Sequence, residues 1–143
     1  MNNSPLIMII DDDKTMVTML NRALEHNGYR VITALHGRIA LAAFQKAKPD
    51  LVLLDIMMPG INGMQVLNTI RQQSHVPVIM LSAAHDQDWL QQALIAGADD
   101  YLKKPFSIRE MIARINAKIR RVNFTKEHTP KKDMVACSSA GKN

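Results

Sequence analysis

The stretch Leu51-Val-Leu-Leu-Asp55-Ile-Met-Met-Pro-Gly60 decides the fold class of this 143-residue chain. Four apolar residues in a row, followed by a carboxylate and a Pro-Gly turn, are typical of a strand buried on both faces of a parallel sheet. Two other runs have the same character: Leu6–Ile10 precedes three aspartates, and Val76–Leu81 precedes a serine. Working outward from these runs, we predict an α/β protein.

Weaker strand signals at Arg30–Ala34 and Asp100–Leu102 bring the expected number of strands to five. Between the strands, apolar residues recur at helical spacing. The five apolar helix faces are Met16, Leu20, Ala23 and Leu24; Ala40, Ala43, Phe44 and Ala47; Val66, Leu67 and Ile70; Leu90, Ala93 and Leu94; and Ile108, Met111, Ile112, Ile115 and Ile119. We expect Asp13 and Ser107 to N-cap the first and last helices and Gly28 to end the first. Five strands alternating with five helices favour a doubly wound sheet.

Composition excludes several classes of protein. No apolar run approaches the about 20 residues that a membrane span needs, and no basic segment precedes Leu6–Ile10 as in a signal peptide. The single cysteine, Cys137, excludes a disulfide framework, so we expect a cytoplasmic protein. Residues 1–106 hold nine Lys/Arg and ten Asp/Glu, whereas residues 107–143 hold nine and three. We predict one domain over residues 5–121 and a basic, disordered linker or tail over residues 122–143.

Polar side chains follow the predicted strands. Asp11 and Asp12 come after the first strand, Asp55 after the third, Ser82 at the end of the fourth and Lys104 after the fifth. The carboxyl ends of parallel strands share one sheet edge, where α/β proteins bind ligands. Three carboxylates there repel one another unless a cation joins them, and an all-oxygen ligand set suits Mg²⁺. With a lysine and a hydroxyl beside it, an aspartate at this edge can accept a phosphoryl group.

Four motifs in order make the chain resemble the receiver domain of two-component response regulators over roughly residues 5–121. The motifs are Ile9-Ile-Asp-Asp-Asp13, Leu53-Leu-Asp-Ile-Met-Met-Pro-Gly-Ile-Asn-Gly63, Val78-Ile-Met-Leu-Ser-Ala83 and Gly97-Ala-Asp-Asp-Tyr-Leu-Lys-Lys-Pro-Phe106. The resemblance implies a flavodoxin-like sheet in strand order 2-1-3-4-5. It also implies a signalling switch that takes a phosphoryl group from a sensor histidine kinase and catalyses only its own phosphorylation and dephosphorylation, so it is not otherwise an enzyme.

The same resemblance assigns residue roles at the sheet edge. Asp55 is the implied phosphoacceptor, Asp12 a direct ligand of Mg²⁺, Asp11 a ligand through water, and the Met57 backbone carbonyl a further ligand. Around the phosphoryl group, the resemblance implies that the Ser82 hydroxyl and Lys104 contact it, that Ala83 leaves room for it and that Tyr101 moves inward after phosphorylation. The resemblance also implies that the side chains of Met57 and Ala84 border the path of the hydrolytic water. Neither orients water, so we expect slow dephosphorylation.

The segment Gly97–Arg121 is most similar to OmpR-like regulators, which implies a homodimer through the fourth helix, fifth strand and fifth helix. A change in this face on phosphorylation would control the output of the signalling switch. Two implied intermolecular pairs are Asp100 with Arg114 and Asp99 with Arg121, whereas Glu110 lacks its partner because Leu90 replaces a basic residue. Transcriptional output would need a DNA-binding domain that is absent from this chain. The alternative is a stand-alone receiver that acts by protein–protein interaction or in a phosphorelay.

Other functions fit these residues less well than a receiver does. Taken singly, each polar residue has a plain structural explanation: a helix cap, a turn or strand end, or a surface lysine. A phosphatase of the haloacid dehalogenase type needs a second acid two residues after the acceptor, where this chain has Met57. A flavin or nucleotide site needs a phosphate loop after the first strand, where three aspartates would repel phosphate. A degenerate receiver that acts only by binding typically lacks one of the functional residues that this chain retains.

Overall fold

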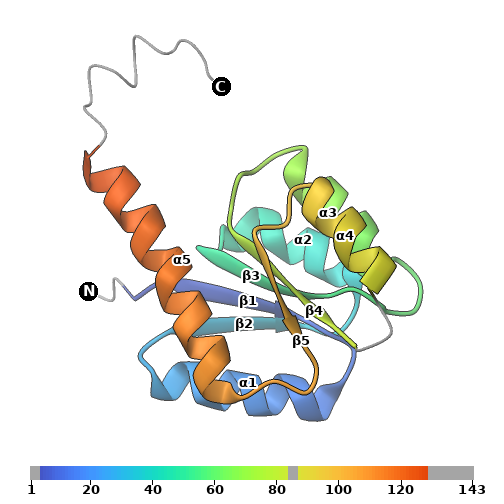
Figure 1. Ribbon diagram of the computed structural model, residues 1–143, viewed down its shortest axis with the longest axis horizontal. Coiled ribbons are helices and arrows are strands. Elements are labelled where there is room, and N and C mark those ends of the chain that lie inside the picture. The colour runs from blue at the N-terminus through green and yellow to red at the C-terminus, as the bar shows by residue number, and fades with distance from the viewer. Residues whose placement is uncertain (1–3, 84–86, 129–143) are drawn as a thin grey trace, which may run out of the picture.

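A computed structural model describes residues 4–83 and 87–128. Its five strands form one parallel sheet in the order β2-β1-β3-β4-β5, which confirms the predicted fold class and strand order (Figure 1). The strands are β1 (Leu6–Ile10), β2 (Arg30–Ala34), β3 (Leu51–Asp55), β4 (Val78–Ser82) and β5 (Asp100–Lys103). Asp55 is therefore the last residue of a strand and does not lie beyond it.

Five helices cover the two faces of the sheet. They are α1 (Lys14–His26), α2 (Gly37–Ala47), α3 (Gly63–Arg71), α4 (Gln87–Ile95) and α5 (Ile108–His128). Figure 1 shows α1 and α5 on one side of the strands, with α2, α3 and α4 on the other. Successive strand residues point to opposite faces, so Met8 and Ile10 pack with α2–α4 while Ile7 and Ile9 pack with α1 and α5. Burial on both faces explains why the central strands are apolar throughout.

The register of the sheet brings the strand ends to one edge. Ile10 pairs with Leu54, Asp55 with Leu81, and Ser82 with Lys103. The residues that end or directly follow β1, β3, β4 and β5 therefore lie along the carboxyl edge, on the right of Figure 1. This edge is where the sequence placed the candidate site.

Local signals set the ends of α1 and the start of α5 as expected. The Asp13 carboxylate accepts from the backbone N–H groups of Thr15 (3.0 Å) and Met16 (3.2 Å), and Ser107 Oγ accepts from Glu110 N (2.9 Å). Gly28 has φ of +89° and lies one residue beyond the C-cap, Asn27. An L side chain rarely adopts this conformation, which explains the glycine.

Three expectations about elements were wrong. The fourth strand begins at Val78 and not at Val76, since Pro77 has no N–H to donate to a neighbouring strand. Leu94 is 41% exposed and does not line the buried face of α4. The last helix does not stop at Arg121 but continues to His128; residues 129–143 of the predicted tail lie outside the described residues. Among the helices described, none combines the length and apolar character needed to cross a membrane.

Candidate functional site

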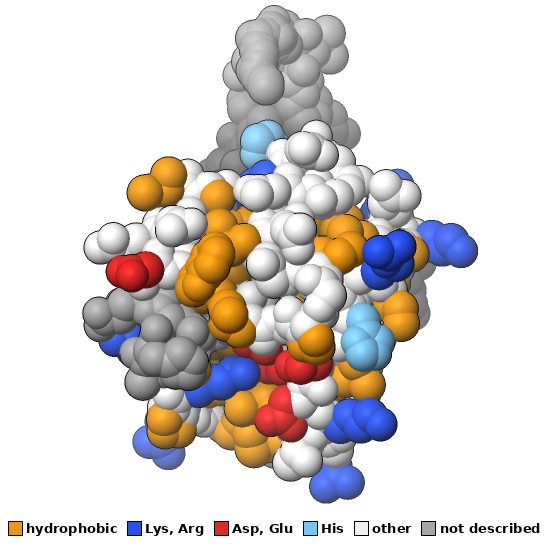
Figure 2. Space-filling view, turned by 90° about the vertical axis from the view of Figure 1, so that its right-hand side faces the viewer, with side chains coloured by type: hydrophobic (Ala, Val, Ile, Leu, Met, Phe, Trp, Pro, Cys, Tyr) orange, Lys and Arg blue, Asp and Glu red, His pale blue; other side chains and the backbone are white. Residues whose placement is uncertain are grey.

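The carboxyl edge of the sheet gathers four of the predicted polar residues. Asp11 follows β1, Asp55 and Ser82 end β3 and β4, and Lys104 follows β5. Asp11, Asp55 and Ser82 are buried, which is unusual for charged and polar side chains without a functional or structural partner. Figure 2 looks onto this edge and shows acidic side chains gathered at its centre, with basic side chains around them.

Three carboxylates form the acidic cluster. Asp11, Asp12 and Asp55 each offer an oxygen atom within 4.8 Å of the other two; Asp12 is exposed and the other two are buried. Asp11 is oriented by its own loop, because its Oδ1 accepts from Asp13 N at 3.0 Å. Three clustered carboxylates are a donor set that fits a hard divalent cation, and this cluster contains the predicted side-chain ligands.

Lys104 lies between two of these carboxylates. Its Nζ is 3.2 Å from Asp11 Oδ2 and 3.5 Å from Asp55 Oδ1, and its backbone N donates to Ser82 O at 2.6 Å. Burial by itself lowers the pKa of the Lys104 ammonium, but the charges of Asp55 and Asp11 outweigh burial and raise that pKa above its ordinary value. Lys104 is therefore a fixed positive charge, as the sequence predicted; Lys103 instead belongs to β5 and is exposed.

Asp55 has the most strongly perturbed carboxyl of the site. Burial, followed by the Asp11 charge, raises its pKa to about 7, against the opposing effect of Lys104. One lysine therefore does not compensate the three carboxylates. Without a bound cation, Asp55 is therefore partly protonated near neutral pH. A cation bound to the cluster would make the ionised, nucleophilic carboxylate the dominant form.

Ser82 supplies an unsatisfied hydroxyl. The residue is 1% exposed, and its Oγ has no hydrogen-bond partner among the described residues. Buried polar atoms are normally hydrogen-bonded, so this hydroxyl is available to an oxygen that enters the site. Ala83 is half-buried directly after it, and Ala84 lies outside the described residues.

Tyr101 is not enclosed in the core in this conformation. It is half-buried and lines a groove of about 320 Å³ between α4 and β5, together with Leu90, Leu94 and Lys103. Leu90 is itself only 7% exposed and packs into the core. The leucine in place of a basic residue therefore contributes to the core and does not stand on the surface.

The loop after Asp55 depends on a glycine to which sequence reasoning gave no role. A Cβ at Gly63 would clash with the backbone oxygen of Asp55 and lie 2.7 Å from Ile56 Cα. Gly63 N also donates to Ile56 O at 2.8 Å, which closes the loop over the acceptor residue. The signal was present in the motif that ends at Gly63, but the close approach is visible only in three dimensions. Met57, within this loop, is 48% exposed.

The charges assigned to the dimer face have partners within the chain. Arg114 Nη1 is 2.8 Å from Asp100 Oδ1, and its Nη2 is 3.2 Å from Glu110 Oε2. Asp99 is paired with Arg71, 2.9 Å away, a residue that the sequence did not single out. Arg121 is exposed on α5. A single chain does not test the intermolecular pairs, which stay predictions.

Comparisons with known proteins agree with one another. The sequence profile of the family described as the response regulator receiver domain matches residues 7–116. The chain is 42% identical over 115 residues to the DNA-binding response regulator MtrA of Mycobacterium tuberculosis, which covers 80% of this chain and 50% of that protein. It is 44% identical over 116 residues to the alkaline phosphatase synthesis transcriptional regulatory protein PhoP of Bacillus subtilis, which covers 80% and 48%.

A solved structure has the same fold. The receiver domain of the Francisella response regulator 1452 superposes with a TM-score of 0.78 at 36% identity, and the match covers 83% of this chain and 99% of that one. The chain spans about half the length of the two curated relatives and nearly all of this isolated domain. The similarity therefore concerns one domain.

Proposed function

This chain belongs to the response regulator receiver domain family, and from that premise we propose that Asp55 takes a phosphoryl group from a phosphohistidine of a sensor histidine kinase. A carboxylate oxygen of Asp55 bonds to phosphorus while the bond from phosphorus to the imidazole nitrogen breaks. The electrons of that bond return to the nitrogen, and the product on this chain is an acyl phosphate. The supporting observation is a buried Asp55 carboxylate with Lys104 Nζ 3.5 Å from Oδ1.

The acidic cluster supports Mg²⁺ as the cofactor. Asp12 and Asp55 would be its carboxylate ligands, Asp11 would act through water, and the Met57 carbonyl would complete the protein's share. When bound, the ion supplies positive charge that offsets the three carboxylates and the incoming phosphoryl oxygens. Lys104 supplies the second positive charge from within the chain. Asp11 would keep Lys104 in place while Asp55 reacts.

The unsatisfied Ser82 hydroxyl and the half-exposed Tyr101 support a conformational switch. The phosphoryl group would draw the Ser82 hydroxyl toward it, and the Tyr101 ring would move into the space that Ser82 vacates. Ala83 would leave room for the group. The phosphoryl group then stabilises the conformer in which Ser82 and Lys104 both reach it, which is a shift of population. The groove between α4 and β5 would change shape as Tyr101 leaves it.

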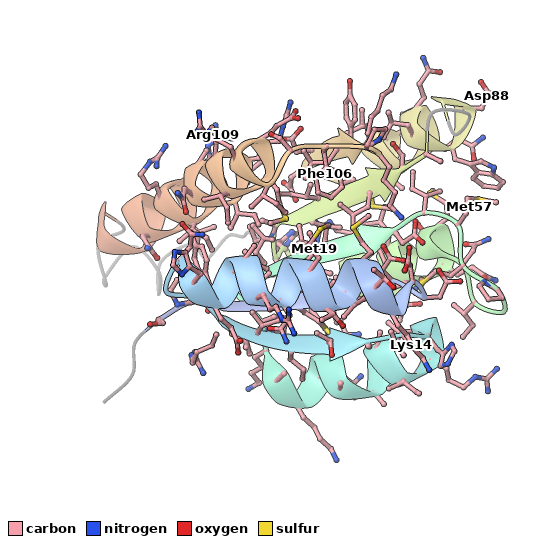
Figure 3. All side chains as sticks on the ribbon, turned by 90° about the horizontal axis from the view of Figure 1, so that it is seen from below. Lys14, Met19, Met57, Asp88, Phe106 and Arg109 are labelled. Carbon is pink, nitrogen blue, oxygen red and sulfur yellow. The ribbon has the colours of Figure 1, made fainter. Side chains whose placement is uncertain are left out.

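The exposed face of α1 supports docking of the kinase. A groove of about 460 Å³ on this helix is lined by Lys14, Thr15, Thr18, Met19 and Arg22. Lys14 lies two residues after Asp12, so the groove starts near the acidic cluster in the chain, and Met19 is 45% exposed. Figure 3 shows Met19 on α1, with Phe106 and Arg109 around the start of α5. An amphipathic helix of the kinase with acidic flanks would fit an apolar centre between basic side chains.

Two features bear on output. The relatives are named as a DNA-binding response regulator and a transcriptional regulatory protein, and the match covers about half of each. We therefore propose a cytoplasmic role in transcription, exerted through a DNA-binding domain that is not part of these 143 residues. Self-association of the phosphorylated form through α4, β5 and α5 would bring two such domains together.

Phosphorylation can be measured directly. The protein is incubated with Mg²⁺ and acetyl phosphate, and intact mass shows whether one phosphoryl group is added. We expect incorporation in the wild type, none in Asp55→Asn, and none in wild type with excess chelator. Asp13→Asn is the matched control, because it changes a neighbouring carboxylate that caps α1 and should incorporate normally. Equal incorporation in Asp55→Asn and wild type would reject the proposed function.

A further inference from the structure

Arg71, the last residue of α3, joins three parts of the chain. Its Nε donates to Gly97 O (2.9 Å), its Nη1 to Ser74 O (3.3 Å) and its Nη2 to Asp99 Oδ2 (2.9 Å). Its side chain is 16% exposed. Gly97 has φ of +116°, and a Cβ there would lie 3.1 Å from Arg71 Nε, so the guanidinium packs directly against the turn from α4 into β5. Because the guanidinium is planar and its donors point in fixed directions, an arginine fixes the geometry of its partners better than the ammonium group of a lysine does.

The two hydrogen bonds to the Asp99 carboxylate both use the same oxygen. Its Oδ2 accepts from Arg71 and also from Val78 N at 2.8 Å, while its backbone N donates to Val78 O at 2.9 Å. Neither side-chain bond uses Oδ1, and the side chain is 41% exposed. The carboxylate thus has a fixed orientation and one oxygen that these bonds leave for a further cation.

The neighbouring acid, Asp100, is paired with basic residues of α5. Asp100 binds Arg114 at 2.8 Å and Lys118 at 3.6 Å, both from α5 of the same chain. Asp99 and Asp100 therefore bind cations from different helices, α3 and α5. Arg121 is a further exposed basic residue of α5. In the proposed two-fold dimer, an acid directly before β5 of one copy would meet a base on α5 of the other, and the contact would be made twice.

We propose that Arg71 is a positioning residue for self-association, which holds Oδ2 of Asp99 so that Oδ1 meets Arg121 of a second copy of this chain. The inference rests on the proposed function, since self-association is its proposed output step. Arg71 lies outside the contact itself and acts through the orientation of one carboxylate. Two-fold symmetry uses each such pair twice, so a small loss of orientation has a doubled effect on the dimer.

The test is a double-mutant cycle on the dimer dissociation constant. Sedimentation equilibrium is run on wild type, Arg71→Gln, Arg121→Gln and the double variant, each with Mg²⁺ and beryllofluoride as the phosphoryl mimic. We expect Arg71→Gln to weaken the dimer three- to tenfold in the wild-type background and less than twofold in the Arg121→Gln background. Arg71→Lys should weaken it two- to threefold, because a lysine can reach Asp99 but does not reproduce the fork.

Three results would overturn the inference. Arg71→Gln could tighten the dimer, which would mean that Arg71 competes with Arg121 for Asp99. It could weaken the dimer equally in both backgrounds, which would make its role purely structural. The wild type could also remain monomeric with the mimic at every concentration. If Arg71→Gln is too unstable to measure, Arg71→Lys gives the same cycle. Failure of the proposed function is seen separately, as a lack of phosphoryl incorporation at Asp55 in the wild type.

Discussion

Replacement of Asp55 by asparagine should stabilise the metal-free protein. Asp55 is a buried carboxyl beside Asp11, and burial together with that neighbouring charge raises its pKa to about 7 from 3.8. Ionised Asp55 therefore costs folding free energy above neutral pH, and Asn removes the charge while keeping nearly the same shape. About three pKa units at about 1.36 kcal/mol each set an upper value of about 4 kcal/mol. Since the charge of Lys104 returns part of this cost, we expect about 1–3 kcal/mol.

The pH dependence has a definite sign. The folded protein binds a proton at Asp55 up to about pH 7, whereas the unfolded chain releases it near 3.8. Stability of the wild type relative to Asp55→Asn should thus fall between about pH 4 and pH 7 and stay level above that window. At pH 8 the variant should melt roughly 4–12 °C higher, at about 4 °C per kcal/mol for a domain of this size.

The assay is thermal unfolding followed by circular dichroism at pH 5 and pH 8, with EDTA or with 10 mM Mg²⁺. Mg²⁺ should raise the melting temperature of the wild type and have little effect on Asp55→Asn, which lacks one of the three carboxylates. Asp13→Asn, outside the cluster, controls for a general effect of removing charge. An equal difference between wild type and Asp55→Asn at both pH values would refute the reasoning, because it would show that Asp55 does not titrate in this window.

Other substitutions test single features of the site. Met57→Asn should speed loss of the phosphoryl group about tenfold or more by orienting water, and an unchanged decay rate by phosphate release would show that residue 57 does not control hydrolysis. Gly63→Ala should cost about 2–3 kcal/mol in chemical denaturation because its Cβ clashes with the Asp55 backbone; wild-type stability would mean that the loop shifts freely. Asp13→Ala should cost about 1 kcal/mol by removing the cap of α1, and no change in the urea midpoint would contradict that role.

The strands and the site edge could be predicted because their signals are local. Continuous apolar runs mark strands covered on both faces, and the residue that follows such a run in a parallel sheet must lie at the carboxyl edge. This reasoning predicts four polar residues at the carboxyl edge, and the structure brings them together: Asp11, Asp55, Ser82 and Lys104. Their roles in binding Mg²⁺ and phosphate remain predictions.

The features that sequence reasoning missed depend on contacts between distant segments. Arg71 and Asp99 are 28 residues apart, and no periodic pattern links the end of a helix to the turn before a strand. The continuation of α5 to His128 was missed because its last residues lack the apolar stripe that marked the helix up to Ile119. In α4, Leu90 of the predicted apolar face is buried as expected, but Leu94 of the same face is 41% exposed, because packing sets the rotation of the helix about its axis.

The three consecutive aspartates at residues 11–13 look redundant in the sequence but are not interchangeable. Asp11 is buried and bound to Lys104, Asp12 is exposed at the cluster, and Asp13 caps α1. A scan of all substitutions should therefore give three different tolerance profiles. Residue 13 should accept Asn, Ser or Thr, residue 12 should accept few replacements beyond another carboxylate, and residue 11 should accept almost none. Deletion of any one of the three would move the remaining aspartates out of the positions in which they bind Lys104, join the cluster or cap α1. The length of this loop is therefore constrained as tightly as its composition.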